Sequence, residues 1–425
     1  MATRRGFLKA GGLALFGISI GGVPGFVARA AGSVKSTGLY KKGKVLICIF
    51  QRGAMDGLMA VTPLTDPYLQ AARPTLFMSA AKNSTNSPKG SPLIDLDGRF
   101  GLHPAMKSFE PLFRDKRLAI VHGIGSPNNT RSHFDAQDYM ESGTPFSKGT
   151  PSGWLNRAIG LLGHDASPFR AVSLTPSMPR SFYGDNPTVA IGDLQDFAIQ
   201  MKGNPLAANM AARSFEDLYD QASSDLLKDT GKESFDAVKM LQKMDTHNYR
   251  PENGAVYPFS PLGNALKQIA QLIKMDVGLE VAFAESTGWD THFNQGTESG
   301  VFARSASDLS NSMAAFWADM EAFQDSVTVM TMTEFGRTVK QNGTGGTDHG
   351  RGSCNFILGN GVNGGIVHGE LRELAVENLE DGRDLPVTTD FRSVFSEVAD
   401  RHLQISDDTV LFPGWQGKKI GTMRS

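Results

Sequence analysis

Short apolar runs, separated by polar segments that contain glycine, recur along the chain and predict buried strands. Four of them span residues 44–50, 117–125, 279–286 and 326–333, and a fifth spans 354–359. Each run has the length of a strand and is continuously apolar, without the alternation that a half-exposed strand would show. These runs therefore predict a central sheet that is covered on both faces.

Apolar residues at helical spacing lie between the predicted strands. The clearest helix spans 303–323, and others are predicted at 102–113, 132–141 and 390–403. Helical patterns also dominate a section at about 205–275 beside the sheet. Strands that alternate with helices are typical of an α/β fold, so we expect a mostly parallel sheet with helices on both faces.

The composition is that of an ordinary globular protein. The 425 residues are 40% hydrophobic and 20% charged, and the net charge of −2 implies no bulk attraction to nucleic acid. Cys48 and Cys354 are too few for a disulfide framework, and both lie in apolar runs. They are expected to be small buried residues.

The first 31 residues have the features of an export signal. A pair of arginines, Arg4 and Arg5, precedes an apolar stretch that ends in an Ala-x-Ala pattern at 28–30. The stretch resembles a twin-arginine signal, which implies export of the folded protein by that translocase to the periplasm or beyond. A retained anchor is the alternative. We expect one domain at 32–425, without a stable membrane span in the mature protein.

Residues that suit catalysis or metal binding follow the predicted strands. In parallel α/β sheets, ligands bind where the carboxyl ends of the strands meet, so these residues are expected to lie close together. The candidate metal ligands are Asp56, Asp290, His292, Glu334, Asp348 and His349. Carboxylates and imidazoles together suit a divalent ion such as zinc, manganese, magnesium or calcium.

The remaining candidates suit chemistry on a small anionic substrate. Ser132 precedes a predicted helix, where backbone N–H groups favour an anion, and it could act as a nucleophile beside His133. Arg131 and Arg351 could bind the anion. Structural roles are the alternatives: Ser132 could cap the helix with Asp135 in a capping box, and Glu334 could pair with Arg337 near the surface.

Several long motifs resemble the domain-of-unknown-function family 1501. They include "RSHFDAQDYMESG", "GWDTHFNQG", "TEFGRTVKQNG" and "GTDHGRG". The resemblance implies the fold of the alkaline phosphatase and sulfatase superfamily, with a hydrolase or transferase of phosphate or sulfate esters as the expected activity. A non-catalytic exported binding or assembly protein on the same fold is the alternative.

The resemblance leaves two placements of the superfamily's adjacent Asp-His pair open. In the first, Asp348 and His349 are the pair, and His368 is the last histidine of the site. In the second, Glu334 and Phe335 stand in place of the pair, and His349 is the last histidine. The second placement would leave an incomplete two-metal site.

Overall fold

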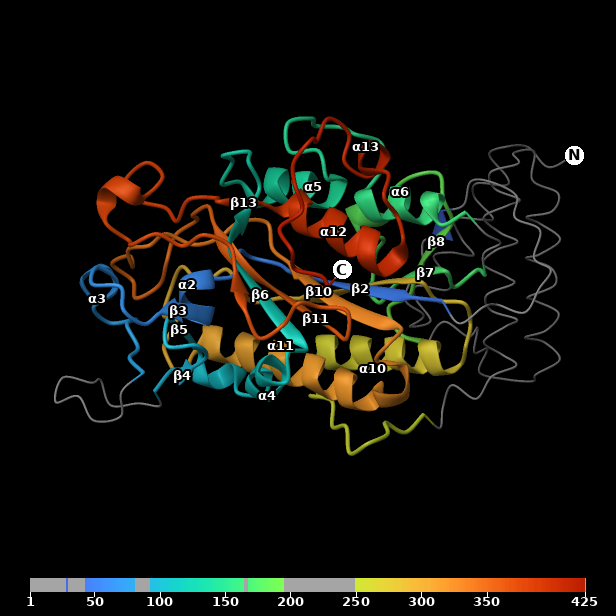
Figure 1. Ribbon diagram of the computed structural model, residues 1–425, viewed down its shortest axis with the longest axis horizontal. Coiled ribbons are helices and arrows are strands. Elements are labelled where there is room, and N and C mark those ends of the chain that lie inside the picture. Colours follow the sequence, from blue (N-terminus) through green and yellow to red (C-terminus); the bar gives the residue numbers. More distant parts are fainter. Residues whose placement is uncertain (1–27, 30–42, 81–91, 164–166, 195–248, 425) are drawn as a thin grey trace, which may run out of the picture.

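A ten-stranded mixed sheet forms the centre of the molecule (Figure 1). The computed structural model describes residues 28–29, 43–80, 92–163, 167–194 and 249–424. The strand order is β1-β8-β7-β9-β2-β10-β11-β6-β12, and β13 also pairs with β6. The strands are β1 (Ala28–Arg29), β2 (Val45–Gln51), β6 (Leu118–Gly125), β7 (Ala171–Ser173), β8 (Thr188–Ala190), β9 (Val281–Ser286), β10 (Val327–Met332), β11 (Ser353–Gly359), β12 (Val367–His368) and β13 (Thr389–Asp390).

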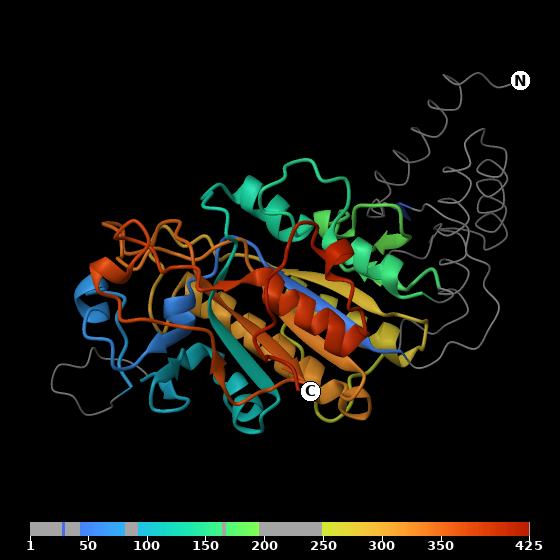
Figure 2. The ribbon, with the colours of Figure 1, turned by 45° about the horizontal axis from the view of Figure 1, so that its top comes forward.

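Helices cover both faces of this sheet (Figures 1 and 2). One face carries α4 (Phe109–Arg114), α10 (Pro261–Lys274) and α11 (Val301–Asp319). The other carries α5 (His133–Ser142), α6 (Trp154–Leu161) and α12 (Phe391–Leu403). The expected three-layer α/β architecture is therefore confirmed. The smaller elements are α2 (Gly57–Ala60), α3 (Leu69–Ala72), α13 (Asp408–Leu411) and a three-stranded sheet of β3 (Val61–Pro63), β5 (Phe100–Leu102) and β4 (Ile94–Asp95).

Alternate residues of the central strands enter two separate cores. On β2, Ile47 and Ile49 join the core beneath α10 and α11, whereas Cys48 and Phe50 join the core beneath α6 and α12. A strand that is buried on both faces needs apolar side chains at every position, which explains the continuous apolar runs. Cys48 and Cys354 are free and buried, as expected.

The direction of the strands determines where the site forms. β9, β2 and β10 are mutually parallel, and β6 runs in the same direction because two antiparallel pairings with β11 separate it from β10. Their carboxyl ends therefore meet at one edge of the sheet, at the left of Figure 1. The loops that follow these strands contain most of the candidate residues.

The predicted helix at 102–113 is wrong in its first half. Leu102 ends β5, which pairs with β3, and a 3-10 turn at Pro104–Met106 follows. The turn begins where His103 adopts an extended backbone and accepts a hydrogen bond from Ala105 N–H. Because Leu102 is extended and pairs with Val61 in the small sheet, the chain is not helical there, and the helix α4 begins only at Phe109.

Two predictions fall largely outside the described residues. Most of the expected signal at 1–31 lies there, and so does the section 205–248 of the predicted helical region. The end of that region is helix α10, which Ser260 caps and Pro261 begins. No helix within the described ranges combines the length and apolar character needed to cross a bilayer.

Candidate metal centre

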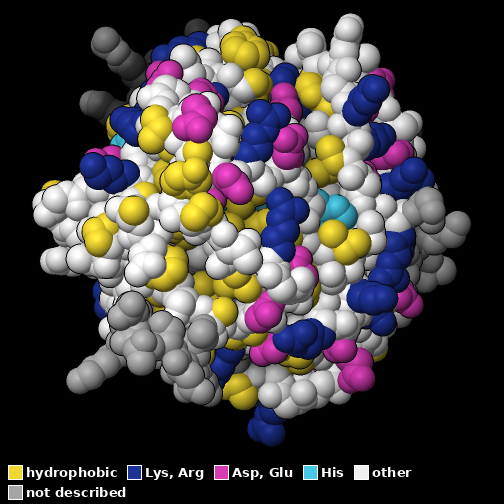
Figure 3. All heavy atoms as spheres, turned by 60° about the vertical axis from the view of Figure 1, so that its left-hand side comes forward, with side chains coloured by type: hydrophobic (Ala, Val, Ile, Leu, Met, Phe, Trp, Pro, Cys, Tyr) yellow, Lys and Arg dark blue, Asp and Glu magenta, His cyan; other side chains and the backbone are white. Residues whose placement is uncertain are grey.

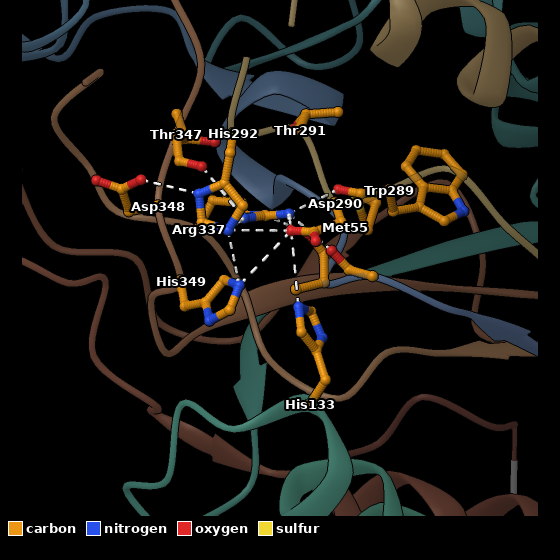
Figure 4. Close-up of polar contacts among 12 residues, drawn as sticks. Met55, His133, Trp289, Asp290, Thr291, His292, Arg337, Thr347, Asp348 and His349 are labelled. Atoms are coloured by element: carbon orange, nitrogen blue, oxygen red, sulfur yellow. Dashed lines mark hydrogen bonds and ion pairs between the residues drawn. The ribbon is translucent and has the colours of Figure 1, made fainter. Parts of the chain in front are cut away.

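Three histidines and one aspartate converge at the carboxyl edge of the sheet (Figure 4). His133 is the first residue of α5, Asp290 and His292 follow β9, and His349 lies in the loop between β10 and β11. The Nε2 atoms of His133, His292 and His349 lie 3.6, 3.2 and 3.5 Å from Asp290 Oδ1. His133, Asp290 and His349 each offer one ligand atom, and these atoms lie within 4.8 Å of one another.

An acceptor on the far side of each ring holds the imidazole in place. Carboxylates and carbonyls only accept hydrogen bonds, so each Nδ1 donates, and in the neutral ring each Nε2 keeps a lone pair. This is the arrangement that orients histidine ligands in metal sites. The pairs are His133 with Glu334 Oε1 (2.8 Å), His292 with Asp348 Oδ1 (2.9 Å) and His349 with the carbonyl of Arg131 (2.8 Å).

Among the described residues no N–H group meets the lone pairs of His133 and His349, and His292 Nε2 accepts only a long hydrogen bond from Arg337 Nη1, at 3.4 Å. His292 Nε2 and His349 Nε2 lie 2.8 Å apart. His133 Nε2 is buried and has no hydrogen-bond partner. Lone pairs this close repel each other unless a proton or a cation lies between them. The donor set therefore fits a bound cation.

The pKa values of Asp290 and His349 are shifted in the direction that favours cation binding, whereas the pKa of His133 is shifted the other way. Burial opposes the ionisation of Asp290, but the hydrogen bond and charge of Arg337 outweigh it and hold the pKa of Asp290 below its usual range. Burial lowers the pKa of His349, which favours the neutral ring that a metal needs. The hydrogen bond to Glu334 raises the pKa of His133. The side chain of Asp290 is 49% exposed, so the cluster is open to solvent on that side.

Helix α5 brings His133 to the cluster. Its backbone turns helical directly after Ser132, which has an extended conformation, and it ends at Gly143 in the left-handed conformation. Ser132 is exposed and makes no capping hydrogen bond with its side chain. The capping box that was the alternative role of Ser132 is therefore absent, and Asp135 pairs with Lys148 at 2.7 Å instead.

The glycines of residues 343–352 let this loop approach the other site loops. A Cβ on Gly346 would lie 2.3 Å from the carbonyl oxygen of His292, and one on Gly350 would lie 2.4 Å from the carbonyl carbon of Arg337. Contacts that short do not occur between real atoms, so glycine is required at both positions. The close approach places Asp348 and His349 on either side of His292.

Asp56 does not join the cluster. It is 1% exposed, and its carboxylate accepts two hydrogen bonds from Arg73, at 2.8 and 3.1 Å. Gln295 donates a third at 2.7 Å, and the N–H of Met59 donates a fourth. These donors occupy the oxygens that a metal would need, so Asp56 stabilises the loops that carry the site.

The residues named in the two placements of the Asp-His pair lie at different distances from the cluster. Glu334 follows β10 directly and supports His133, while His349 reaches the cluster. His368 lies on β12 and donates to the carbonyl of Asn363. Glu334 and Asp348, both predicted as ligands, instead accept hydrogen bonds from the Nδ1 atoms of His133 and His292, on the side of each ring away from the cluster.

The two arginines predicted to bind an anion have other partners. Arg131 forms ion pairs with Asp384 and Asp381, and Arg351 pairs with Glu380 at 2.7 Å. Arg337 is the arginine that contacts the cluster, through Asp290 and His292. The alternative role, a salt bridge to Glu334 near the surface, does not hold, because Arg337 is buried and pairs with Asp290. The sequence feature that could have indicated Arg337 as a site residue is its position three residues after Glu334, in the loop that follows β10.

The fold and the site define an α/β protein with an imidazole–carboxylate cluster at the carboxyl edge of its sheet. The chain belongs to the family described as "Protein of unknown function (DUF1501)", whose model matches residues 43–411. No relative was found among curated proteins.

Two solved structures resemble the chain at low identity. The lipoteichoic acid synthase LtaP from Listeria monocytogenes has 10% identity and a TM-score of 0.30, over 80% of this chain and 70% of that one. Alkaline phosphatase from the Antarctic bacterium TAB5 has 11% identity and a TM-score of 0.32, over 76% of this chain and 93% of that one. At TM-scores this low, neither likeness defines the activity.

Proposed function

We propose that the protein is an exported metal-dependent hydrolase or transferase that acts on phosphate or sulfate esters. The supporting observation is the convergence of three Nε2 lone pairs on Asp290, with each ring held from behind. Imidazole nitrogen suits zinc better than magnesium or calcium, so zinc is the ion that we favour.

The chain's own residues have distinct roles in this proposal. His133, Asp290, His292 and His349 would hold the ion, which would polarise the ester and stabilise charge on its oxygens. Ser132 is the proposed nucleophile, because its exposed hydroxyl precedes His133 at the start of the ten-residue helix α5. Basic and acidic side chains are interspersed over this end of the molecule (Figure 3), so attraction of an anion would depend on the site itself.

Metal content and ester hydrolysis test the proposal together. The mature protein, loaded with zinc and freed of excess ion, is expected to retain metal and to hydrolyse nitrophenyl phosphate or nitrophenyl sulfate. His349→Gln should lose both properties, whereas the control His368→Gln should keep both, because His368 bonds only to Asn363 among the described residues. A metal-free wild-type protein without activity on either ester would contradict the proposal.

A non-catalytic binding protein on the same fold is the second candidate. The ion pairs of Arg131 and Arg351 favour it, because carboxylates of the protein already engage both guanidiniums. This candidate predicts that the protein retains metal without hydrolysing any ester of the panel, and that Ser132→Ala leaves all binding unchanged.

A further inference from the structure

Arg337 places a permanent positive charge inside the metal cluster. We propose that the site takes one divalent ion, and that the guanidinium of Arg337 supplies the charge that a second ion would otherwise supply. The inference rests on the proposed function, since it concerns an anionic substrate at the same site.

The contacts of Arg337 hold the guanidinium in one position. Its side chain is fully buried, and it donates to backbone carbonyls of three site loops as well as to Asp290 Oδ1 at 2.5 Å. The guanidinium donates to these acceptors from Nε, Nη1 and Nη2, so all three of its nitrogens are held in place. The carbonyls belong to Gly53 (2.9 Å), Ala54 (2.9 Å), Trp289 (3.0 Å) and Thr347 (3.1 Å).

Asp290 lies between the guanidinium and the histidines. Its Oδ1 accepts from Arg337 Nη2 and lies 3.2 Å from His292 Nε2. Arg337 Nη1 also lies 3.4 Å from His292 Nε2. An ion held by the imidazoles would therefore share Asp290 with Arg337, and the positive guanidinium would repel a second cation on that side.

In each of the other two carboxylates near the cluster, the oxygen that faces a cluster histidine is occupied by hydrogen-bond donors. Glu334 Oε1 accepts from His133 Nδ1, Gln137 Nε2 and the N–H of Gly53. Asp348 Oδ1 accepts from His292 Nδ1 and Asn342 Nδ2. An oxygen surrounded by N–H groups is a poor ligand for a cation. Among the described residues, only one group of metal-ligating side chains meets at a common point.

The first test counts ions in the wild-type protein. The mature chain is titrated with zinc by calorimetry, and the metal retained after desalting is measured by mass spectrometry. One tightly held ion per chain is expected. With manganese, the electron paramagnetic resonance spectrum should be that of an isolated ion. Two ions per chain, or a spin-coupled manganese pair, would overturn the inference even if esters are hydrolysed, and so would the absence of any bound ion.

The second test separates charge from architecture. Arg337→Met removes the charge and keeps much of the volume, and Arg351→Met is the control because Arg351 is also buried but pairs with Glu380. Arg337→Met is expected to retain one ion while its affinity for inorganic phosphate falls by about tenfold or more, because the loss of the guanidinium leaves the negative charge of Asp290 uncompensated beside the anion. The control should retain both.

A folded Arg337→Met protein that loses the ion, or binds phosphate normally, would show that Arg337 only ties the loops together. Circular dichroism and the melting temperature establish folding. If the variant does not fold, the ion count in the wild type still tests whether the site takes one ion. One bound ion without hydrolysis of any ester would refute the proposed function and leave the single-ion site standing.

Discussion

At the scale of single residues, the atoms behind the histidines prepare the site. Each Nδ1 has an acceptor, and two of these acceptors are the carboxylates Glu334 and Asp348. Burial alone would raise the pKa of Glu334, but the hydrogen bonds from His133 and Gln137 keep it below its usual range. Glu334 is therefore an anion that fixes the orientation of His133 and increases the basicity of its Nε2.

Replacing Glu334 by glutamine tests this outer shell. Glu334→Gln should weaken zinc binding by about 10- to 100-fold, as the loss of outer-shell partners does elsewhere. The control Glu285→Gln removes a carboxylate at the end of β9 that pairs with Arg52 rather than with a cluster histidine. Calorimetric titration with zinc measures both. Equal affinities in the two variants would show that the charge of Glu334 is unimportant.

Ser132 can be tested separately from the metal. Ser132→Ala should keep its bound ion and lose ester hydrolysis, because the exposed Ser132 hydroxyl does not cap α5. Acid-quenched wild-type protein should carry a phosphoryl or sulfuryl group on Ser132 that mass spectrometry detects. Hydrolysis at the wild-type rate by Ser132→Ala would assign the attack to water or to another residue.

At the scale of elements, the glycine loop at 343–352 carries two site residues across to the loop after β9. Its backbone pairs Arg337 with His349 and bonds Thr338 N–H to the carbonyl of Asp348. Gly346 and Gly350 are required where this loop touches its neighbours, whereas a Cβ on Gly343 would meet nothing within 4 Å. One loop therefore supplies both an essential glycine and its matched control.

The glycine pair gives a prediction about the loop. Gly350→Ala forces a backbone contact at Arg337 and should destabilise the fold by about 1–3 kcal/mol, as overpacking typically does. It should also weaken zinc binding, because His349 is the adjacent residue. Gly343→Ala should resemble the wild type in both respects. Melting temperature and zinc titration check the pair, and equal behaviour of the two variants would contradict the role given to close approach.

At the scale of the whole molecule, buried histidines couple the fold to pH. His103, His122 and His402 are buried, and burial lowers the pKa of each to about 4. His402, for example, lies between Thr328 and the carbonyl of Val45. These rings are neutral in the folded protein, whereas the unfolded chain takes up protons at its ordinary histidine pKa of about 6.5.

This difference predicts acid sensitivity. Between about pH 6.5 and pH 4 the unfolded state binds more protons, so the free energy of unfolding should fall as the pH falls. Each histidine contributes at most about 3 kcal/mol to this loss. Urea denaturation across this pH range measures it. His402→Gln should lower stability at neutral pH and flatten the pH dependence, and an unchanged slope would contradict the assignment.

Much of the fold could be predicted from local patterns. The apolar runs at 44–50, 117–125 and 326–333 became β2, β6 and β10 within one or two residues at each end. Burial on both faces leaves a continuous apolar run, which is visible without knowing any partner. The antiparallel direction of β11 was not predictable, because a run of apolar residues is the same in both directions.

The sequence by itself determined the strands, most of the helices and the loops in which the chemistry lies. Only the tertiary structure decided which residues point to the centre of the cluster and which accept hydrogen bonds behind the histidines. Asp290 and Asp348 both lie within two residues of a histidine, yet Asp290 faces the Nε2 atoms and Asp348 accepts from Nδ1. The difference depends on contacts such as Arg337 with Asp290, which join residues far apart in the chain. Such contacts cannot be predicted from local sequence patterns.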